Sequence, residues 1–378
     1  MPDKDFFAEF PPVSKADWLN KVRNDLKNDQ LEDFNWEIAE DLSQSPFVHA
    51  DDFPVAPIAT PSSNTSWAIC ETIEVEDAVR ANKEALDALQ GGAEALEFVF
   101  AKQADFPAFE ALFEGIHPDF IGLHFSGPGV SQNPANVFAL LDQILKLSNK
   151  KSDSLHGTLY FDPVKAGGII DWRYLTDLIE FSSDSFPNFS LISLELEAND
   201  NPAVSLALLI KRVNEYIVKL AERGVKPETS TRFMHLIVPV GNSYFLEIAK
   251  LRALRLLWFN LLKAWEIPLK APVVHASINS ESYSDNLYSN MISGTTAAMS
   301  AIMGGVDRLT VLPYDSGRES VATYPKAFSR RIARNVQHLL KLESNLHELN
   351  DPAAGSYYIE HLSAKIAEKA WQEFKKLG

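Results

Sequence analysis

The chain has 378 residues, of which 46% are hydrophobic and 23% charged, so it can bury a large core and is not mainly disordered. Its 35 Lys and Arg against 51 Asp and Glu give a net charge of −16. This balance argues against nucleic acid as a partner, and it means that any anionic ligand must be held by a local pocket of Arg and Lys.

Residues 1–66 are predicted to form an amino-terminal arm and linker. Residues 1–10 are acidic and lack the basic start and apolar run of a secretory signal. Apolar residues four apart predict a helix over Ser14–Asn28. Residues 42–66, rich in Pro, Ser, Asn and Asp, predict an extended connection and no packed element. Two arrangements stay open, an arm over a partner and an arm packed on its own chain.

Residues 67–378 alternate between short apolar runs and helical stretches, which indicates parallel βαβ units. The runs are Leu96–Phe100, Ile121–Phe125, Gly157–Phe161, Leu191–Leu196, His235–Val240, Pro272–Ser277 and Leu309–Pro313. The helical stretches are Phe106–Phe113, Ala135–Ser148, Trp172–Phe181, Pro202–Arg223, Tyr244–Trp265, Tyr288–Met303 and Ser363–Leu377. An eighth strand is either Trp67–Ile73 or Ser356–Glu360. We therefore predict an α/β fold, a (β/α)8 TIM barrel, with a doubly wound open sheet as the alternative.

Several strong motifs are absent. The sequence has no GxGxxG, GxxxxGK[ST], HExxH or GxSxG, so it signals neither nucleotide binding nor a metalloprotease or serine-hydrolase site. The single cysteine, Cys70, excludes an internal disulfide and any paired-cysteine metal site, and it favours a reducing, cytoplasmic compartment. The longest apolar run, Ala203–Ile210, is too short to cross a bilayer, so no membrane partner is expected.

Two histidines are candidate ligand contacts. His124 and His275 lie within predicted strands near their carboxyl ends. In a barrel these ends surround the mouth where active sites form, so both side chains would reach a ligand there. His275 is thus a candidate catalytic residue and the candidate cofactor-binding residue. The alternative, which we favour for both, is a hydrogen-bonded histidine of the core or rim.

Glu195 and Glu197 are the candidate acid–base pair. Their spacing of two places both on one face of a strand. Facing into the barrel, two like charges would raise the pKa of one carboxyl group, as in general acid–base pairs. Facing outward, they would contact helix amines or solvent. The outward arrangement is favoured because Leu194 and Leu196 fill the opposite face.

Five arginines lie on two predicted helices: Arg252, Arg255, Arg330, Arg331 and Arg334. The guanidinium fork bonds two oxygens at once and therefore suits phosphate. In so acidic a chain, however, surface ion pairs are the more common role for helical arginines, and we favour that role here.

Five blocks of the sequence, in this order along the chain, resemble the methylmalonyl-CoA mutase family and, within it, the barrel region of the small (β) subunit. They are residues 10–22 (FPPVSKADWLNKV), 245–258 (FLEIAKLRALRLLW), 275–301 (HAS, then a stretch containing TTAAMSA), 328–337 (FSRRIARNVQ) and 351–360 (DPAAGSYYIE). The resemblance implies a coenzyme-B12-dependent isomerase that interconverts succinyl-CoA and methylmalonyl-CoA. It also implies a CoA tail along the barrel axis and adenosylcobalamin over the mouth, held by a further domain with a DxHxxG histidine.

Departures from the family pattern suggest which role the chain has. The active subunit carries a SGYHMQEAGA segment, whose Tyr and His handle the substrate, whereas the matching Ser193–Asp200 contains neither. The RTHxQTSGWSLT block keeps only His275, and DxHxxG is absent. We therefore expect a non-catalytic small subunit that pairs with a catalytic large (α) subunit. Adenosylcobalamin would belong to the holo complex and not to this chain alone. The stretch Tyr244–Trp265 could supply the subunit contact or ordinary barrel packing.

Other functions stay open at this stage. The chain could be an independent acyl-CoA or small-acid enzyme that uses Glu195, Glu197 or His275, or a stand-alone binding or assembly protein. Without a large subunit it could form a homodimer. The replacement of small polar groups by Leu194 and Leu196 hints that side chains fill the barrel axis.

Overall fold

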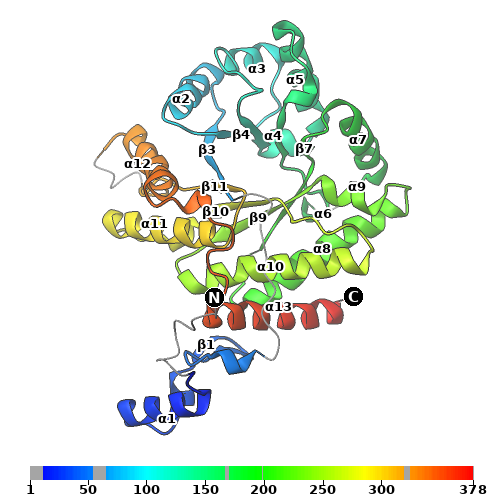
Figure 1. Ribbon diagram of the computed structural model, residues 1–378. Helices are drawn as coiled ribbons and strands as arrows, with labels where there is room; N and C mark the ends of the chain where they lie inside the picture. Colours follow the sequence, from blue (N-terminus) through cyan, green and yellow to red (C-terminus); the bar gives the residue numbers. More distant parts are fainter. Residues whose placement is uncertain (1–11, 54–64, 167–169, 198, 319–323, 378) are drawn as a thin grey trace, which may run out of the picture.

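The computed structural model describes residues 12–53, 65–166, 170–197, 199–318 and 324–377. A ring of parallel strands forms its centre (Figure 1). The strands are β3 (Ala68–Glu74), β4 (Ala95–Val99), β5 (Gly122–Ser126), β6 (His156–Leu159), β7 (Phe189–Ser190), β8 (Ile192–Glu195), β9 (Met234–Val240), β10 (Val274–Ile278) and β11 (Arg308–Thr310). Strands β7 and β8 are separated only by Leu191 and act as one bent strand, in which β7 pairs with β6 and β8 with β9. This strand closes the sheet, so the fold is a (β/α)8 TIM barrel and the alternative of an open sheet is wrong.

The eighth strand is β3, which corresponds to the predicted Trp67–Ile73. The other candidate, Ser356–Glu360, is not a strand, because a helix begins at Tyr357. Gly355 precedes that helix with a positive φ of 82°, a conformation that glycine adopts without steric cost. The apolar residues of this segment therefore serve a helix face and not a sheet.

Helices surround the barrel, and every predicted helical stretch is present. Those that follow the strands are α2 (Ala78–Gln90), α3 (Phe106–Leu112), α4 (Pro128–Ser131), α5 (Pro134–Ser148), α6 (Pro163–Ala166), α7 (Trp172–Ser185), α8 (Pro202–Ala221), α9 (Pro227–Arg232), α10 (Tyr244–Ala264), α11 (Leu287–Met303) and α12 (Lys326–His338). The last helix, α13 (Tyr357–Leu377), lies across α8 and α10 (Figure 1). Helix α10 packs against α8, α11 and α13, so ordinary packing within the chain accounts for its many buried Leu and Trp side chains.

The amino-terminal arm contains α1 (Lys15–Leu26) and a hairpin of β1 (Trp36–Ala39) and β2 (Leu42–Gln44). The hairpin lies on α13, where the side chain of Gln44 is fully buried and its Oε1 lies 3.0 Å from Nδ1 of His361. Part of the stretch 42–66 is therefore packed, contrary to the expectation of an extended connection, because β2 buries alternate side chains against α13. Residues 54–64 of that stretch lie outside the described residues.

The two faces of the barrel strands differ in chemistry. Side chains that point outward to the helices are apolar and buried, such as Phe98, Leu123 and Phe125. Each fully buried side chain of this size contributes about 2–3 kcal/mol to folding, so this outer layer holds the barrel together. The side chains that alternate with them point inward and are largely polar, which places candidate functional groups inside the ring. Among the described residues, no helix is both long and apolar enough to cross a membrane.

Candidate functional site

Polar side chains from non-adjacent strands meet inside the barrel. The hydroxyl of Tyr160, just after β6, lies 2.6 Å from Nδ1 of His275 on β10. Nη2 of Arg308 on β11 donates to the same hydroxyl at 2.8 Å, and that hydroxyl donates to Oε2 of Glu97 on β4 at 3.2 Å. Contacts between strands that are not neighbours in the sheet must cross the axis, so these groups occupy the barrel interior. We call Glu97, His124, Tyr160, His235, His275 and Arg308 the interior cluster.

Every member of the interior cluster has a partner. Arg308 Nη1 donates to Nδ1 of His124, and Nε2 of His275 lies 2.9 Å from Oγ1 of Thr310. The Glu97 carboxylate also accepts from the Ser126 hydroxyl at 2.8 Å. The cluster is deeply buried, with Arg308 only 6% exposed. It forms a polar layer in which most polar atoms are paired, while Nε2 of His235 and Nε of Arg308 have no hydrogen-bond partner among the described residues.

The three histidines of the cluster are held neutral. Burial, followed by the nearby positive charge of Arg308, lowers the pKa values of His124, His235 and His275 well below their usual value. The ring of His235 lies with its Nδ1 3.2 Å from the hydroxyl of Ser193. A neutral imidazole held by hydrogen bonds, as His275 is at both ring nitrogens, is suited to a structural network.

The positions of His124 and His275 correct the prediction that they lie near the carboxyl ends of their strands. His124 is the middle residue of β5, and His275 is the second residue of β10, aligned with Arg308 on β11. The apolar run begins at Pro272, but strand pairing begins only at Val274, so the sequence overestimated how far along the strand His275 lies. Both rings lie inside the barrel below the mouth, in hydrogen bonds with other side chains.

Sequence analysis missed Glu97, Tyr160 and Arg308, which organise the interior. A usable signal exists for two of them, since Glu97 is a charged residue within an apolar strand and Arg308 begins one. The sequence gives no such signal for Tyr160, because a tyrosine within an apolar run is also common as an ordinary core residue.

Glu195 and Glu197 lie at the carboxyl rim of the barrel. Glu195 lies on the same face of β8 as Ser193, the face that points into the barrel, but its side chain is 44% exposed. Its carboxylate accepts a hydrogen bond from Nζ of Lys165 at 2.5 Å. Glu197 accepts from Nη1 of Arg212 on α8 at 3.0 Å. Each carboxylate thus has its own cation, so the two do not form a pair that shares a proton. Leu194 points outward to the helices, so it is the interior cluster and not Leu194 that fills the axis.

The helical arginines are mostly buried, which corrects the expectation of surface ion pairs. Arg252 is 1% exposed and lies between Asp351 and Glu360, the latter at 2.6 Å. Arg255 donates to the carbonyl oxygens of Gly304 and Gly305 at the end of α11. These arginines satisfy buried acceptors that connect α10 to its neighbours, because a buried acceptor without a partner costs free energy.

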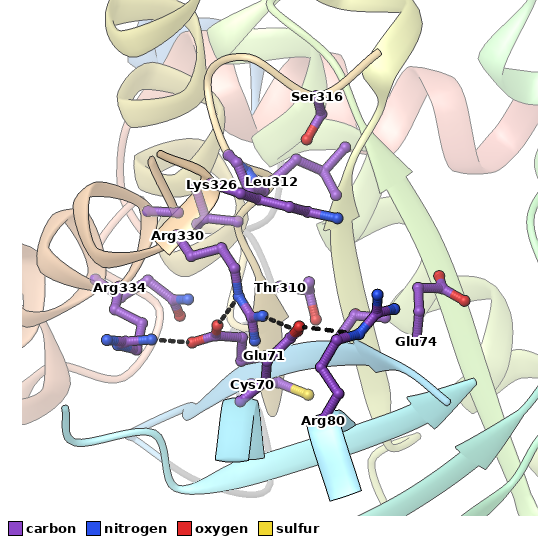
Figure 2. Close-up of a pocket in the computed structure, with 16 residues that line it drawn as sticks. Cys70, Glu71, Glu74, Arg80, Thr310, Leu312, Ser316, Lys326, Arg330 and Arg334 are labelled. Carbon is purple, nitrogen blue, oxygen red and sulfur yellow. Dashed lines mark hydrogen bonds and ion pairs between the residues drawn. The ribbon is translucent and has the colours of Figure 1, made fainter. Parts of the chain in front are cut away.

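Arg330 and Arg334 both contact Glu71 at the side of the barrel. Nε of Arg330 donates to Oε1 of Glu71 at 2.5 Å, and Nη1 of Arg334 donates to Oε2 at 2.6 Å (Figure 2). Arg331 instead lies over the ring of Phe328, 5.3 Å from its centroid. The two inner arginines line a cavity with an empty volume of about 870 Å³, part of it open to solvent, between β3, β11, α2 and α12. We call it the β3–β11 pocket.

The described residues do not fit adenosylcobalamin as a resident group. The cobalt of a corrinoid takes a histidine nitrogen as its protein ligand, in the form that the family resemblance implies. The histidines inside the barrel, His124, His235 and His275, are buried in the interior cluster. Among the described residues, no group of three or more His, Cys, Asp or Glu side chains could hold a metal ion. No reaction step on this chain is therefore assigned to this cofactor.

Comparison with known proteins identifies the family. The sequence model of methylmalonyl-CoA mutase matches residues 105–378. The chain is 30% identical to the methylmalonyl-CoA mutase small subunit of Porphyromonas gingivalis, over 97% of this chain and 63% of that protein. It is 26% identical to the small subunit of Streptomyces virginiae, over 98% of this chain and 64% of that protein. For the small subunit of Propionibacterium freudenreichii subsp. shermanii the identity is 28%, over 70% of this chain and 44% of that protein.

The chain thus spans less than two thirds of the length of these relatives. The matched region nevertheless includes most of the barrel strands and the helices α10 to α13. With the barrel, the buried motif arginines and these matches together, the chain belongs to the methylmalonyl-CoA mutase family.

Proposed function

We propose that this chain acts as the non-catalytic small subunit of a heterodimeric, adenosylcobalamin-dependent methylmalonyl-CoA mutase. In this role it stabilises a catalytic large subunit in the cytoplasm and leaves the isomerisation of succinyl-CoA and methylmalonyl-CoA to that subunit. A folded partner stabilises another chain by mass action, since it binds the folded state and not the unfolded one.

The interior cluster is the observation that carries this proposal. A thioester on the barrel axis would have to displace Tyr160 and Arg308, which hydrogen-bond each other at 2.8 Å. Their displacement would break the hydrogen bonds from Tyr160 to the Glu97 carboxylate and from Arg308 to His124, and buried polar groups that lose their partners cost free energy. The cluster therefore supports a barrel that serves as a scaffold.

The rim supports the same interpretation. A general acid or base must be free to exchange a proton with substrate. Glu195 is paired with Lys165 and Glu197 with Arg212, while both nitrogens of His275 have partners. The alternative of an independent acyl-CoA enzyme that uses Glu195, Glu197 or His275 would need these contacts to open first.

A reconstitution assay tests the proposal. The chain is assayed alone, the large subunit alone and the two together, each with adenosylcobalamin and methylmalonyl-CoA. We expect no turnover from this chain alone, and a higher thermal midpoint for the large subunit when this chain is present. Turnover by the isolated chain would refute the proposal.

A titration separates the alternative enzyme from the scaffold. CoA thioesters are added to the isolated wild-type chain and to Glu195→Gln. The scaffold predicts no saturable binding to either protein. Saturable binding that the substitution weakens would favour the independent enzyme instead.

A further inference from the structure

The β3–β11 pocket exists because two neighbouring strands separate. The pairing of β11 with β3 ends at Thr310 and Cys70, whereas β3 continues to Glu74 alongside β4. Beyond Thr310 the chain leaves the sheet, and side chains from α2 and α12 approach the opening. The result is a cavity in the barrel wall that adjoins the interior cluster at Thr310, whose hydroxyl lies 2.9 Å from Nε2 of His275.

The lining of the pocket is positive in a strongly negative protein. Its charged residues are four cations against three carboxylates, a balance of 4 − 3 = +1: Arg80, Lys326, Arg330 and Arg334 against Glu71, Glu74 and Glu84. The whole chain carries −16. Two of these cations also pair with carboxylates just outside the lining, Arg80 with Glu76 and Arg334 with Asp87, so any attraction for an anion must come from the cationic groups that remain unpaired.

The carboxylates of the pocket are largely neutralised already. Glu71 accepts from both Arg330 and Arg334, and Glu84 accepts from Nη1 of Arg330. Glu74 has no such arginine, and desolvation raises its pKa above the usual range. Glu71 and Glu84 are thus paired with arginines of the lining, whereas Glu74 has only the nearby charge of Lys326 to oppose the rise of its pKa.

Two cationic side chains that line the pocket have hydrogen-bond donors without a partner among the described residues. The ammonium of Lys326 makes no hydrogen bond or ion pair within the part of the chain that the structure describes. The side chain extends from the first turn of α12 into the space between Ser316 and Arg80 (Figure 2). Nη2 of Arg330 is buried without a hydrogen-bond partner, while the side chain as a whole is only 10% exposed. A buried donor without a partner calls for a bound group or a water molecule.

From these observations we propose that the β3–β11 pocket binds a small oxyanion, either a phosphate monoester or a carboxylate. Lys326 supplies a full charge at the entrance, and Nη2 of Arg330 supplies a donor at the inner wall. Leu312, Pro313 and Ala333 give the organic part of such a ligand an apolar surface. The site is independent of the partner subunit and of turnover, so it holds or fails separately from the proposed function.

Equilibrium dialysis of the full chain tests the site, with radiolabelled inorganic phosphate as the probe and unlabelled propionate as the competitor. The buffer contains no other oxyanion. We expect saturable binding of one phosphate per chain. Displacement by propionate would extend the ligand class to carboxylates, and its absence would restrict the class to phosphates.

Substitutions at an exposed lysine make the test specific. Lys326→Met should weaken phosphate binding at least about tenfold, because it removes a charge-assisted contact. Lys326→Arg should restore binding. The matched control is Lys83→Met, which removes the same charge from an exposed position on α2 outside the pocket lining and should change affinity less than about twofold.

The folded state of each variant is checked by its thermal midpoint, which should stay close to that of wild type because the Lys326 ammonium makes no hydrogen bond or ion pair within the described residues. Absence of saturable binding up to about 10 mM phosphate would mean that water alone satisfies Arg330, and the proposal would be overturned. Equal affinities of Lys326→Met and Lys83→Met would overturn it as well.

Discussion

The interior cluster and the β3–β11 pocket use similar side chains for different ends. In the interior cluster, Arg308 faces a tyrosine hydroxyl and a histidine ring that are themselves bonded onward. In the pocket, two nitrogens of Arg330 donate to glutamates and the third has no hydrogen-bond partner. The ammonium of Lys326 has no partner among the described residues. Among the described residues both arginines keep one buried nitrogen without a partner, Nε in Arg308 and Nη2 in Arg330, so the two regions differ in the exposed ammonium of Lys326 and in the opening of the pocket to solvent.

Removal of the central cation should produce the largest effect. Arg308→Met leaves Glu97 buried without a nearby cation and removes one neighbour of Tyr160. We expect the free energy of unfolding to fall by about 3–5 kcal/mol, measured by urea denaturation. The double variant Arg308→Met with Glu97→Gln should recover part of that loss. A loss below about 1 kcal/mol would show that the interior cluster is not the self-contained unit described above.

A buried arginine outside the barrel extends the comparison. Arg252→Met removes the cation between Asp351 and Glu360, both of which are nearly buried. The expected loss is about 3 kcal/mol in the free energy of unfolding. The control is Arg173→Met at an exposed position on α7, which should change stability by less than about 0.5 kcal/mol. Equal effects for the two variants would contradict a structural role for Arg252.

Acid should destabilise the interior through its histidines. In the folded chain, burial lowers the pKa values of His124, His235 and His275 well below the usual histidine value of 6.5. Below about pH 6.5 the unfolded chain therefore binds more protons than the folded one, so stability falls as the pH is lowered. Each histidine adds up to about 1.4 kcal/mol per pH unit to this slope.

The measurement is urea unfolding at a series of pH values between about 7.5 and 5. His235→Gln should reduce the slope of the free energy of unfolding against pH, by an amount that corresponds to at most one bound proton, because it removes one of the titrating groups. An unchanged slope in His235→Gln would mean that His235 is not held neutral in the folded protein.

The smallest effect is expected at the rim. Glu195→Gln removes an ion pair with Lys165 in which both side chains are more than 40% exposed. Solvent screens such a pair, so the loss should not exceed about 0.5 kcal/mol. The activity of the complex reconstituted with the large subunit should be unchanged. A large loss of that activity would indicate that Glu195 has a catalytic role.

Sequence periodicity predicted the barrel well, because buried parallel strands and amphipathic helices leave strong local patterns. The strand at Leu96–Phe100 and the helix at Pro202–Arg223 are confirmed within a few residues. The packed hairpin at Leu42–Gln44 was not predicted, because it is short and owes its burial to α13, more than 300 residues later in the chain.

The amino-acid sequence by itself determined the class of fold and the family, since these depend on local pattern and on residue identity. Only the tertiary structure decided that Arg308 and Tyr160 close the barrel axis, that Arg252 is buried and that Lys326 has no partner among the described residues. The physical reason is that a polar side chain acquires its role from the groups opposite it. Those groups come from strands and helices far away in the chain, and no local pattern specifies them.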